Sequence, residues 1–439
     1  MSLQEASQVV TKKVIITTSG GDIDVTSLFD TIEIFDSIFT TQVSGHIVIT
    51  DALGLSGKLS FDGTDVITIQ IGKSSQSDIA ETKKAYRIYK QGNRRNVNQT
   101  SERYVLYFVS NEMIFSEQQT VNQSFVKTYS DIANSILSNQ LKVSQEKVGI
   151  IDESTKIKKV VIPELKPLKA ISWCASRATD TKDVPSFLFF ENNNGFNFVT
   201  LSTLNAEESV LDINFNIKNL GAGGLLEMSS AKSFEIVTQD DLFQKIKNGA
   251  YAGSFLGFDP VTRSYDTKTI TFDDVYNKIE HANEYPLKTE VVNPDQTSTL
   301  TSFDSKHVLS IFNTKRTQSK YIKAKDSASF TTDEDYASIL LQRQNIIYNL
   351  VSKIIKISLP GNFQLTSGVN VNVFFPGFNK REKSIGDESV TGKYLITGAR
   401  QIIGLQKHDT IIEVATDSTN SGKNRLSSPE QKEALEESA

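Results

Sequence analysis

Short segments of apolar and β-branched residues follow one another through the first quarter of the chain. The candidate strands cover residues 14–17, 32–35, 46–50, 66–71, 86–89 and 104–109, and glycine-containing turn signals are predicted between them at residues 19–21, 44–45, 61–63 and 91–93. Six short strands with regular turns predict an antiparallel barrel or sandwich rather than βαβ units. Residues 104–109 are apolar on both faces, so a second domain, a neighbouring subunit or the chain's own helices must cover the face turned away from the core.

A second β-rich pattern lies near the carboxyl end, after a helix predicted over residues 336–350. Ile339, Ile346 and Leu350 share one face of that helix because they are spaced seven and four residues apart. Strand-like segments follow at residues 354–362, 369–377, 392–400 and 410–416, separated by Gly and Pro-Gly. They predict half of a second β-domain, whose missing strands we place upstream at residues 228–238. We expect a turn with positive φ at Gly361, so a β-branched residue there should abolish soluble, assembling protein.

Between these regions the periodicity changes to that of helices. Phe125, Tyr129, Ile132 and Ile136 follow steps of four, three and four residues, which predicts an amphipathic helix over residues 124–141. A second helix is predicted to begin at Pro167, since proline suits the first helical turn. Residues 186–200 form two apolar runs around an Asn-Asn-Gly turn, which indicates a hairpin. Together these elements predict a small α+β domain.

The pattern loosens in the middle of the chain. A helix over residues 240–248 is predicted to end at Gly249, which suits a left-handed cap. From there to about residue 335 the chain is rich in Ser, Thr, Asn and Asp, and we interpret it as a surface insertion with one short helix over residues 272–283. Residues 419–439 are polar without apolar periodicity, and such a tail is disordered in isolation unless a partner holds it.

The predicted fold class is therefore mainly β with α+β: two antiparallel β-barrel domains plus smaller mixed domains. The predicted boundaries are 11–115 for the first barrel, 116–204 for the α+β domain, 205–240 with 341–418 for a discontinuous second barrel, 241–340 for the inserted domain and 419–439 for the tail. A chain of 439 residues is too long for one ordinary core, which agrees with several domains.

Composition narrows the classes of function. The formal net charge of -5 argues against a surface built to grip nucleic acid. Cys174 is the single cysteine, so no internal disulfide can form and a cytosolic folding compartment is compatible. No run of 18 apolar residues occurs, and the polar first residues lack the layout of a signal peptide, so we expect no membrane anchor.

Candidate chemistry is sparse. His46, His281, His307 and His408 show no metal-ligand spacing. Cys174 lies on the apolar face of a predicted helix with no histidine near it in sequence, which favours a core residue over a nucleophile. Asp22 with Asp24 could bind a cation but fits solvated turn carboxylates better, and the acidic residues 333–335 suit a helix N-terminus capped by Thr332. We assign no catalytic, cofactor-binding or metal-binding residues, and predict that the protein is not an enzyme.

Several segments together resemble the central baseplate hub proteins of contractile-tailed bacteriophages, the T-even hub family. Residues 44–51 with 61–71 look like the first hub barrel. Residues 167–178, 187–192 and 195–201 carry the most specific match. Residues 246–252 with Asp259-Pro260 and Ser264-Tyr265 resemble the start of the family's insertion, and residues 359–362, Phe375-Pro376 and 392–397 look like the second barrel. Residues 285–329 match little.

The resemblance implies a homotrimer in which each subunit contributes two similar barrels. Three subunits then form a pseudo-sixfold ring that adapts a sixfold tail tube to a trimeric cell-puncturing spike. The implied partners are the spike, the tail tube or its initiator proteins and other baseplate proteins, and DNA passes through the channel without specific binding. The implied location is the virion tail baseplate, after assembly in the host cytoplasm.

Two alternatives stay open. One is a tail-associated hydrolase of the cell wall, because a pair of catalytic carboxylates is recognised by its separation in space and not by sequence. The other is the hub of a related contractile secretion or injection system. The lack of a fused spike repeat after Thr416 favours the phage version.

Overall fold

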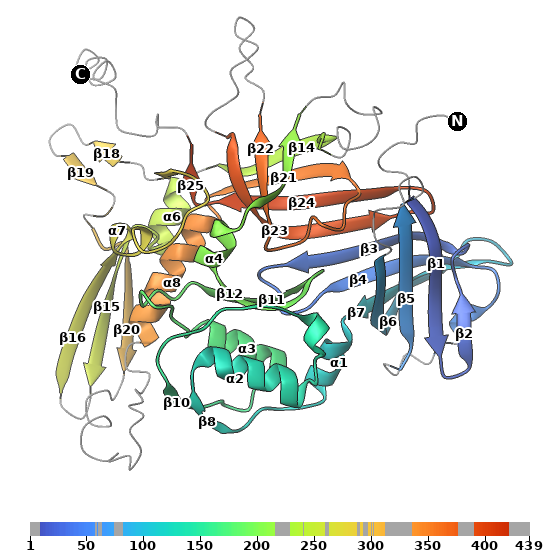
Figure 1. Ribbon diagram of the computed structural model, residues 1–439, viewed down its shortest axis with the longest axis horizontal. Coiled ribbons are helices and arrows are strands. Elements are labelled where there is room, and N and C mark those ends of the chain that lie inside the picture. The colour runs from blue at the N-terminus through green and yellow to red at the C-terminus, as the bar shows by residue number, and fades with distance from the viewer. Residues whose placement is uncertain are drawn as a thin grey trace, which may run out of the picture.

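The computed structural model describes residues 9–57, 59, 64–73, 82–215, 229–239, 241–259, 263–287, 290–292, 297–299, 301, 303–311, 336–375 and 390–420. Strands dominate it, with helices grouped beside them (Figure 1). The mainly β class with mixed α+β parts is thus confirmed. The predicted tail at 419–439 lies outside the described residues except for its first two positions, and so do the acidic residues 333–335.

One sheet contains strands from both ends of the chain. From the amino-terminal part come β1 (Val9–Thr18), β2 (Gly21–Asp24), β3 (Phe29–Ser37), β4 (Ser44–Asp51), β5 (Val66–Lys73), β6 (Thr82–Asn96) and β7 (Glu102–Val109). From the later part come β13 (Ser209–Asn214), β14 (Ser233–Gln239), β21 (Lys353–Pro360), β22 (Asn370–Phe374), β23 (Gly392–Ile403) and β24 (His408–Thr416). Their order is β14-β21-β24-β23-β3-β4-β7-β6-β5-β1-β2; off this path, β22 pairs with β23 and β13 pairs with β22.

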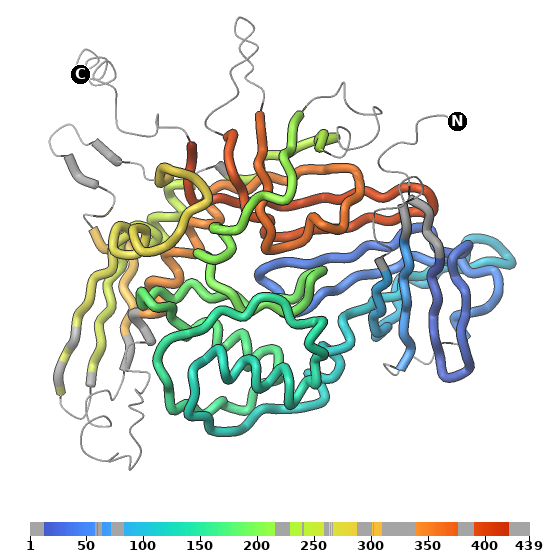
Figure 2. The backbone as a smooth tube through the Cα atoms, viewed as in Figure 1, coloured from blue at the N-terminus to red at the C-terminus, as the bar shows by residue number. Residues whose placement is uncertain are grey.

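The pairing of β23 with β3 makes the sheet continuous. Residues at opposite ends of the chain therefore lie side by side, as the contact between the blue and the red segments shows (Figure 2). Each half of the sheet surrounds its own apolar core, one containing Ile32, Ile47 and Leu106 and the other Ile355, Val371 and Ile412. In the part of the chain that the structure describes, the named strands of neither half form a closed ring of pairs, although Asn214 at the end of β13 forms a parallel bridge with Ser230, just before β14.

The six strands predicted in the first quarter are confirmed, but two turn signals are wrong. Gly45 lies inside β4, where an added Cβ would lie 2.5 Å from the Phe108 ring, so the residue is small for packing reasons. Gly92 lies inside β6 beside a bulge, and the following Asn93 takes φ +53°. Glycine in a strand marks a close approach or a bulge as readily as a turn.

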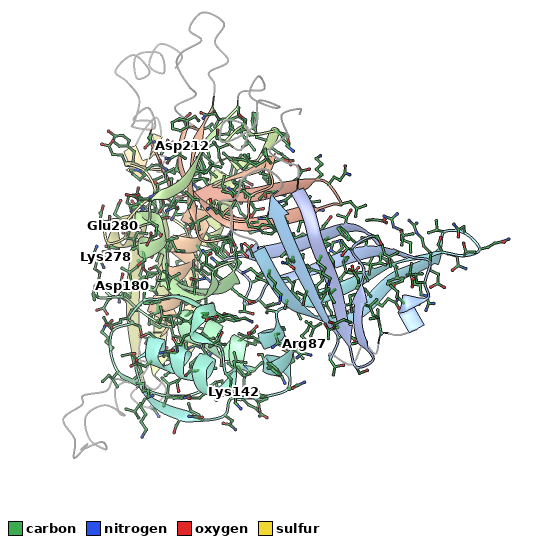
Figure 3. The ribbon with its side chains drawn as sticks, turned by 45° about the vertical axis from the view of Figure 1, so that its right-hand side comes forward. Arg87, Lys142, Asp180, Asp212, Lys278 and Glu280 are labelled. Carbon is green, nitrogen blue, oxygen red and sulfur yellow. The ribbon has the colours of Figure 1, made fainter. Side chains whose placement is uncertain are left out.

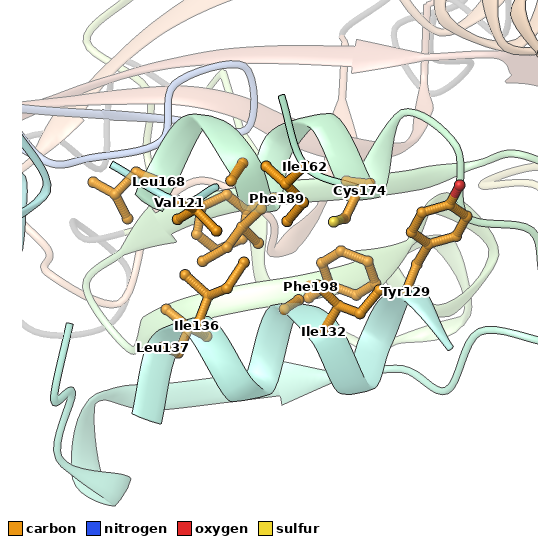
Figure 4. Packing of buried hydrophobic residues seen from close by; sticks show 14 of the residues in the cluster. Val121, Tyr129, Ile132, Ile136, Leu137, Ile162, Leu168, Cys174, Phe189 and Phe198 are labelled. Carbon is orange, nitrogen blue, oxygen red and sulfur yellow. The ribbon is translucent and has the colours of Figure 1, made fainter. Parts of the chain in front are cut away.

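The α+β part packs two helices on a short sheet. Its elements are α1 (Asn111–Glu117), β8 (Ser124–Lys127), α2 (Tyr129–Ser135), a π-helical turn (Ile136–Gln140), a 3-10 turn (Gln145–Lys147), β9 (Val148–Ile151), β10 (Lys158–Val161), α3 (Pro167–Ala175), β11 (Phe187–Asn192), β12 (Gly195–Thr200) and α4 (Leu201–Ala206); a further 3-10 turn (Leu55–Gly57) lies between β4 and β5 of the large sheet. The helix beginning at Pro167 and the Asn-Asn-Gly hairpin are confirmed. Figure 4 shows Ile132, Leu168, Cys174 and Phe198 in the shared core.

The helix predicted over residues 124–141 is wrong at its start. Residues 124–127 form β8, which pairs with β10, and the helix begins at Tyr129. Thr128 is extended, and its hydroxyl accepts a hydrogen bond from the Asp131 N–H, which marks it as the N-cap. Phe125 lies on β8 and is buried there, so its match to the helical spacing was coincidental.

The middle of the chain holds more regular structure than its polar composition predicted. It contains α6 (Leu242–Asn248), β15 (Ala252–Asp259), β16 (Ser264–Thr271), α7 (Phe272–Tyr276), β17 (Tyr285–Pro286), β18 (Glu290–Val292), β19 (Thr297–Thr299), β20 (Lys306–Ile311) and α8 (Tyr336–Leu350), and β17 pairs with β25 (Ser418–Thr419). The prediction for residues 249–335, a surface insertion with one short helix, missed β15, β16 and β20, which form one sheet. Helix α7 is also shorter than the predicted helix. One face of this sheet packs on α8 through residues such as Phe255 and Ile270, whereas Tyr265 and Leu309 are exposed.

Two glycine predictions have opposite outcomes. Gly249 ends α6 with φ +76°, as predicted. Gly361 does not have positive φ, so the predicted turn is wrong. Instead it directly follows the last residue of β21, its N–H donates to the His408 carbonyl at 2.8 Å, and an added Cβ would lie 2.0 Å from His408 Cγ.

Candidate functional site

The two halves of the large sheet repeat the same arrangement of six strands. In chain order, β1, β3, β4, β5, β6 and β7 correspond to β13, β14, β21, β22, β23 and β24. Each set pairs its second strand with its third, the third with the sixth, the sixth with the fifth, the fifth with the fourth and the fourth with the first. One pairing differs in direction, because β1 and β5 are antiparallel whereas β13 and β22 are parallel. We call the two sets the first and the second repeat.

The registers of the repeats agree at their buried central positions, although β6 has a second bulge after Gly92 that β23 lacks. A bulge interrupts β6 after Ile88 and β23 after Ile396. With these bulges aligned, buried Tyr86 coincides with buried Tyr394. On the neighbouring strands Ile47 of β4 coincides with Ile357 of β21, and both are fully buried. A shared bulge and a shared register are specific features, since a slip of one residue would reverse every side chain.

The repeats meet where β23 pairs with β3 in the middle of the sheet. Arg400 on β23 donates two hydrogen bonds to the Glu33 carboxylate on β3, at 3.1 Å and 2.8 Å. The same guanidinium lies 5.5 Å from the centre of the Phe35 ring. A bidentate pair of this kind fixes the register of two strands as well as contributing energy. The junction inside the chain is thus held by backbone pairing and by a charged clamp.

The Asn-Asn-Gly turn of the β11–β12 hairpin docks against both repeats. Asn192 Nδ2 donates to the Ser367 carbonyl at 2.7 Å, and Asn193 Nδ2 donates to the Phe363 carbonyl at 2.8 Å, both in the second repeat. Lys84 of the first repeat donates to the Asn193 carbonyl at 2.7 Å. The turn therefore sets the angle between the α+β part and the sheet, and it borders a cavity of about 370 Å³.

Two buried carboxyls complete this polar junction. Asp36 on β3 accepts hydrogen bonds from the Ser367 N–H at 2.6 Å and the Thr366 hydroxyl at 2.9 Å, and Glu191 on β11 accepts one from the Val43 N–H at 2.8 Å. Burial raises the pKa of Asp36 to about 6 and that of Glu191 to about 7, although these hydrogen bonds act in the opposite direction. Burial also lowers the pKa of Lys84, which lines the same cavity.

The residues considered as catalytic or metal-binding candidates lie on different elements and do not form a common site. Cys174 is fully buried in the α+β core, as predicted. His46 lies on β4, His307 on β20 and His408 on β24, while His281 follows α7 and hydrogen bonds Asp417 at 2.7 Å. Within the described ranges no three metal-ligating side chains come together. Asp22 and Asp24 lie on β2 and accept hydrogen bonds from Thr17 and Thr26.

Sequence reasoning missed the residues that hold the junction. Asp36, Glu191 and Arg400 belong to no motif, and their partners lie more than a hundred residues away in sequence. One signal was available for Glu191, because it follows the wholly apolar run Phe187-Leu-Phe-Phe190. A carboxyl at the end of a buried strand requires a partner.

Comparisons with known proteins give structural relatives alone, since no family model and no curated protein matches the chain. The fold superposes on a tail protein from Neisseria meningitidis MC58 with a TM-score of 0.51 and 12% identity, covering 92% of this chain and 96% of that one. A 43 kDa tail protein of prophage MuSo2 from Shewanella oneidensis matches with a TM-score of 0.51 and 9% identity, covering 92% and 98%. The chain has the fold of phage tail proteins.

The similarity extends over nearly the whole of both tail proteins, so it includes the two repeats and the parts between them. At such low identity the fold is what is shared. In the described part of the chain no helix is both long and apolar enough to span a membrane.

Proposed function

We propose that the protein is the structural hub of a phage tail baseplate, a homotrimer that joins a sixfold tail tube to a trimeric spike. The observation that supports the proposal is the repeat of six strands inside one continuous sheet. A chain with two equivalent units supplies six units when three copies assemble. Closed rings of this kind are the usual result when one contact is repeated by rotation.

The proposed partners are the tube protein or its initiator on one side of the ring and the spike on the other, with further baseplate proteins around it. DNA passes through the central channel, and the net charge of -5 suits a wall that does not hold phosphate. The proposed location is the tail of the virion after assembly in the host cytoplasm. The tail-protein fold of the relatives supports this role.

The role needs no chemistry. A hydrolase of the cell wall would require two carboxyls that face a substrate groove. The buried carboxyls described above, Asp36 and Glu191, are engaged with backbone N–H groups of neighbouring segments. A structural role, in which these carboxyls join neighbouring segments by hydrogen bonds, accounts for their burial.

The decisive measurement is the mass of the purified protein in solution, alone and mixed with candidate tube and spike proteins. We expect particles of three chains of 48.7 kDa each, which bind both partners. A protein that stays monomeric at every concentration and binds neither partner contradicts the hub. A zymogram on peptidoglycan provides the second arm, and lysis abolished by one carboxylate substitution would favour the hydrolase.

A further inference from the structure

The two repeats differ most at one strand. In the first repeat, β3 lies inside the sheet, between β4 and β23, and its Ile32 and Ile34 are 0% and 6% exposed. The corresponding strand of the second repeat is β14, which within the described residues pairs with β21 alone. Phe234 and Ile236 take the places of Ile32 and Ile34 there and are 38% and 39% exposed.

The opposite free edge belongs to the first repeat. Strand β23 pairs with β24 on one side, and on its other side with β22 at its start and β3 at its end. Strand β6 pairs in the same way with β7 and with β5, but β5 reaches only as far as Arg87. Beyond that point, within the described residues, the side of β6 away from β7 has no strand against it. Figures 1 and 3 show the β6–β7 hairpin projecting from the body.

We propose that a second copy of this chain occupies these edges, with β14 of one copy pairing antiparallel with the end of β6 in the next. The β23–β3 junction inside each chain is the template for this contact. A β14 edge and a β6 edge on every copy make the contact head-to-tail, so junctions within and between chains alternate around a ring. The inference rests on the assembly proposed above and specifies its contact.

The register follows from the template. Ile402 faces Glu33 across the β23–β3 pair. Arg95 holds the place of Ile402, because Arg95 pairs with Arg103 on β7 as Ile402 pairs with Asp409 on β24. Glu235 holds the place of Glu33 by the pairings of β14 and β3 with their neighbours. Arg95 of one copy therefore faces Glu235 of the next.

The chemistry of the two edges agrees with this register. The end of β6 carries Lys90, Arg94 and Arg95, all exposed, whereas β14 carries Glu235 between exposed apolar side chains. Arg95 lies opposite Arg103, whose guanidinium already pairs with Asp30 at 3.0 Å, so an acid brought to this place would pair with Arg95. A flat strand with unpaired backbone groups and exposed Phe and Ile is also an aggregation hazard unless another strand covers it.

A disulfide tests the register directly. Facing residues of paired strands lie within reach of a disulfide, so the variant Arg95→Cys with Glu235→Cys should form links between chains, seen as a ladder in non-reducing gels. The matched control is Glu33→Cys with Ile402→Cys, which should close within one chain without changing its mass. If the control oxidises and the test variant stays single-chain under assembling conditions, the proposed contact is wrong.

Charge and exposure provide two further tests by light scattering. Arg95→Glu should lower the assembled fraction at least tenfold, and adding Glu235→Arg on the same chain should restore it. Val237→Lys on β14 should also prevent assembly, whereas Val210→Lys on β13 should not, although the two valines are 45% and 44% exposed. Equal effects at the two valines, or no rescue by the reversed pair, overturn the inference.

These outcomes separate the contact from the hub. If trimers form but the cysteine variant gives no link between chains and Val237→Lys is tolerated, the hub proposal is supported and the β14–β6 contact is contradicted. Disulfide-linked chains in fibres, or in rings of another size, support the contact and remove the trimer. A wild-type chain that never assembles, together with a double-cysteine variant that never forms links between chains, overturns both.

Discussion

The two repeats have the same strand order and align at their buried central positions, yet one places its second strand in the middle of the sheet and the other leaves it at an edge. Ile34 and Ile236 are the same residue type at equivalent positions, and they are 6% and 39% exposed. Side-chain identity at a position therefore does not decide burial; the neighbouring strand does. The second repeat carries residues suited to a covered strand, yet no strand among the described residues covers that edge.

The largest expected difference between the repeats comes from placing aspartate at Ile34 and at Ile236. Ile34→Asp places an unpaired carboxyl in the core and should lower the free energy of unfolding by about 4 kcal/mol or more, enough to abolish soluble protein. Ile236→Asp in the isolated chain should cost less than about 1 kcal/mol. Thermal unfolding of the monomer measures both, and equal losses would show that β14 is already covered.

The residue type at the position of Gly361 differs between the repeats, because the aligned residue of the first repeat is the buried Asp51. Gly361→Val should cost about 3 kcal/mol or more, since the new Cβ would lie 2.0 Å from His408 Cγ and the ring is enclosed. Soluble yield and melting temperature measure the effect. Gly57→Val is the control, as an added Cβ there meets nothing within 4 Å, and a similar loss in both would contradict the steric explanation.

The buried carboxyl of Glu191, which accepts a hydrogen bond from the Val43 N–H, predicts that the stability of the fold depends on pH. Because its pKa is raised from 4.5 to about 7, its protonated form stabilises the fold below about pH 4.5, and this contribution is lost as the pH rises through 7. Glu191→Gln should therefore be more stable than the wild type at pH 8, by on the order of 2 kcal/mol, with little difference at pH 5.

Thermal unfolding at the two pH values measures this difference. Glu207→Gln, on an exposed residue, is the control and should follow the wild type. Parallel curves for the wild type and Glu191→Gln would exclude the carboxyl as the source of the pH dependence.

The clamp between the repeats should have the smallest effect. Arg400→Gln removes a bidentate pair whose arginine is 43% exposed, and it should cost about 1 kcal/mol. Arg94→Gln removes a similar pair with Glu102 inside the β6–β7 hairpin and should cost less, because its two residues are 53% and 34% exposed. Denaturant unfolding compares the two, and a larger loss from Arg94→Gln would show that the clamp adds nothing at the junction.

Much of the secondary structure followed from local pattern. Alternation predicted the strands around Ile47 and Ile357, Pro167 and Gly249 predicted a helix start and a helix end, and the Asn-Asn-Gly turn predicted its hairpin. These signals act over a few residues, so one sequence contains them. The signals failed at Phe125, a strand residue that also fits the spacing of a helix. They failed again in β16, where one face of the strand is exposed and polar residues hide the strand pattern.

The sequence by itself determined a mainly β chain with a β-rich region at each end and a mixed region between them. Only the tertiary structure decided that both ends share one sheet, that Asp36 and Glu191 meet backbone donors from distant segments, and that β14 lies at an edge. Local pattern sets the period of the side chains, whereas strand neighbours separated by hundreds of residues are chosen by packing and register. The correspondence of Arg95 with Ile402 and of Glu235 with Glu33 became visible only through those neighbours.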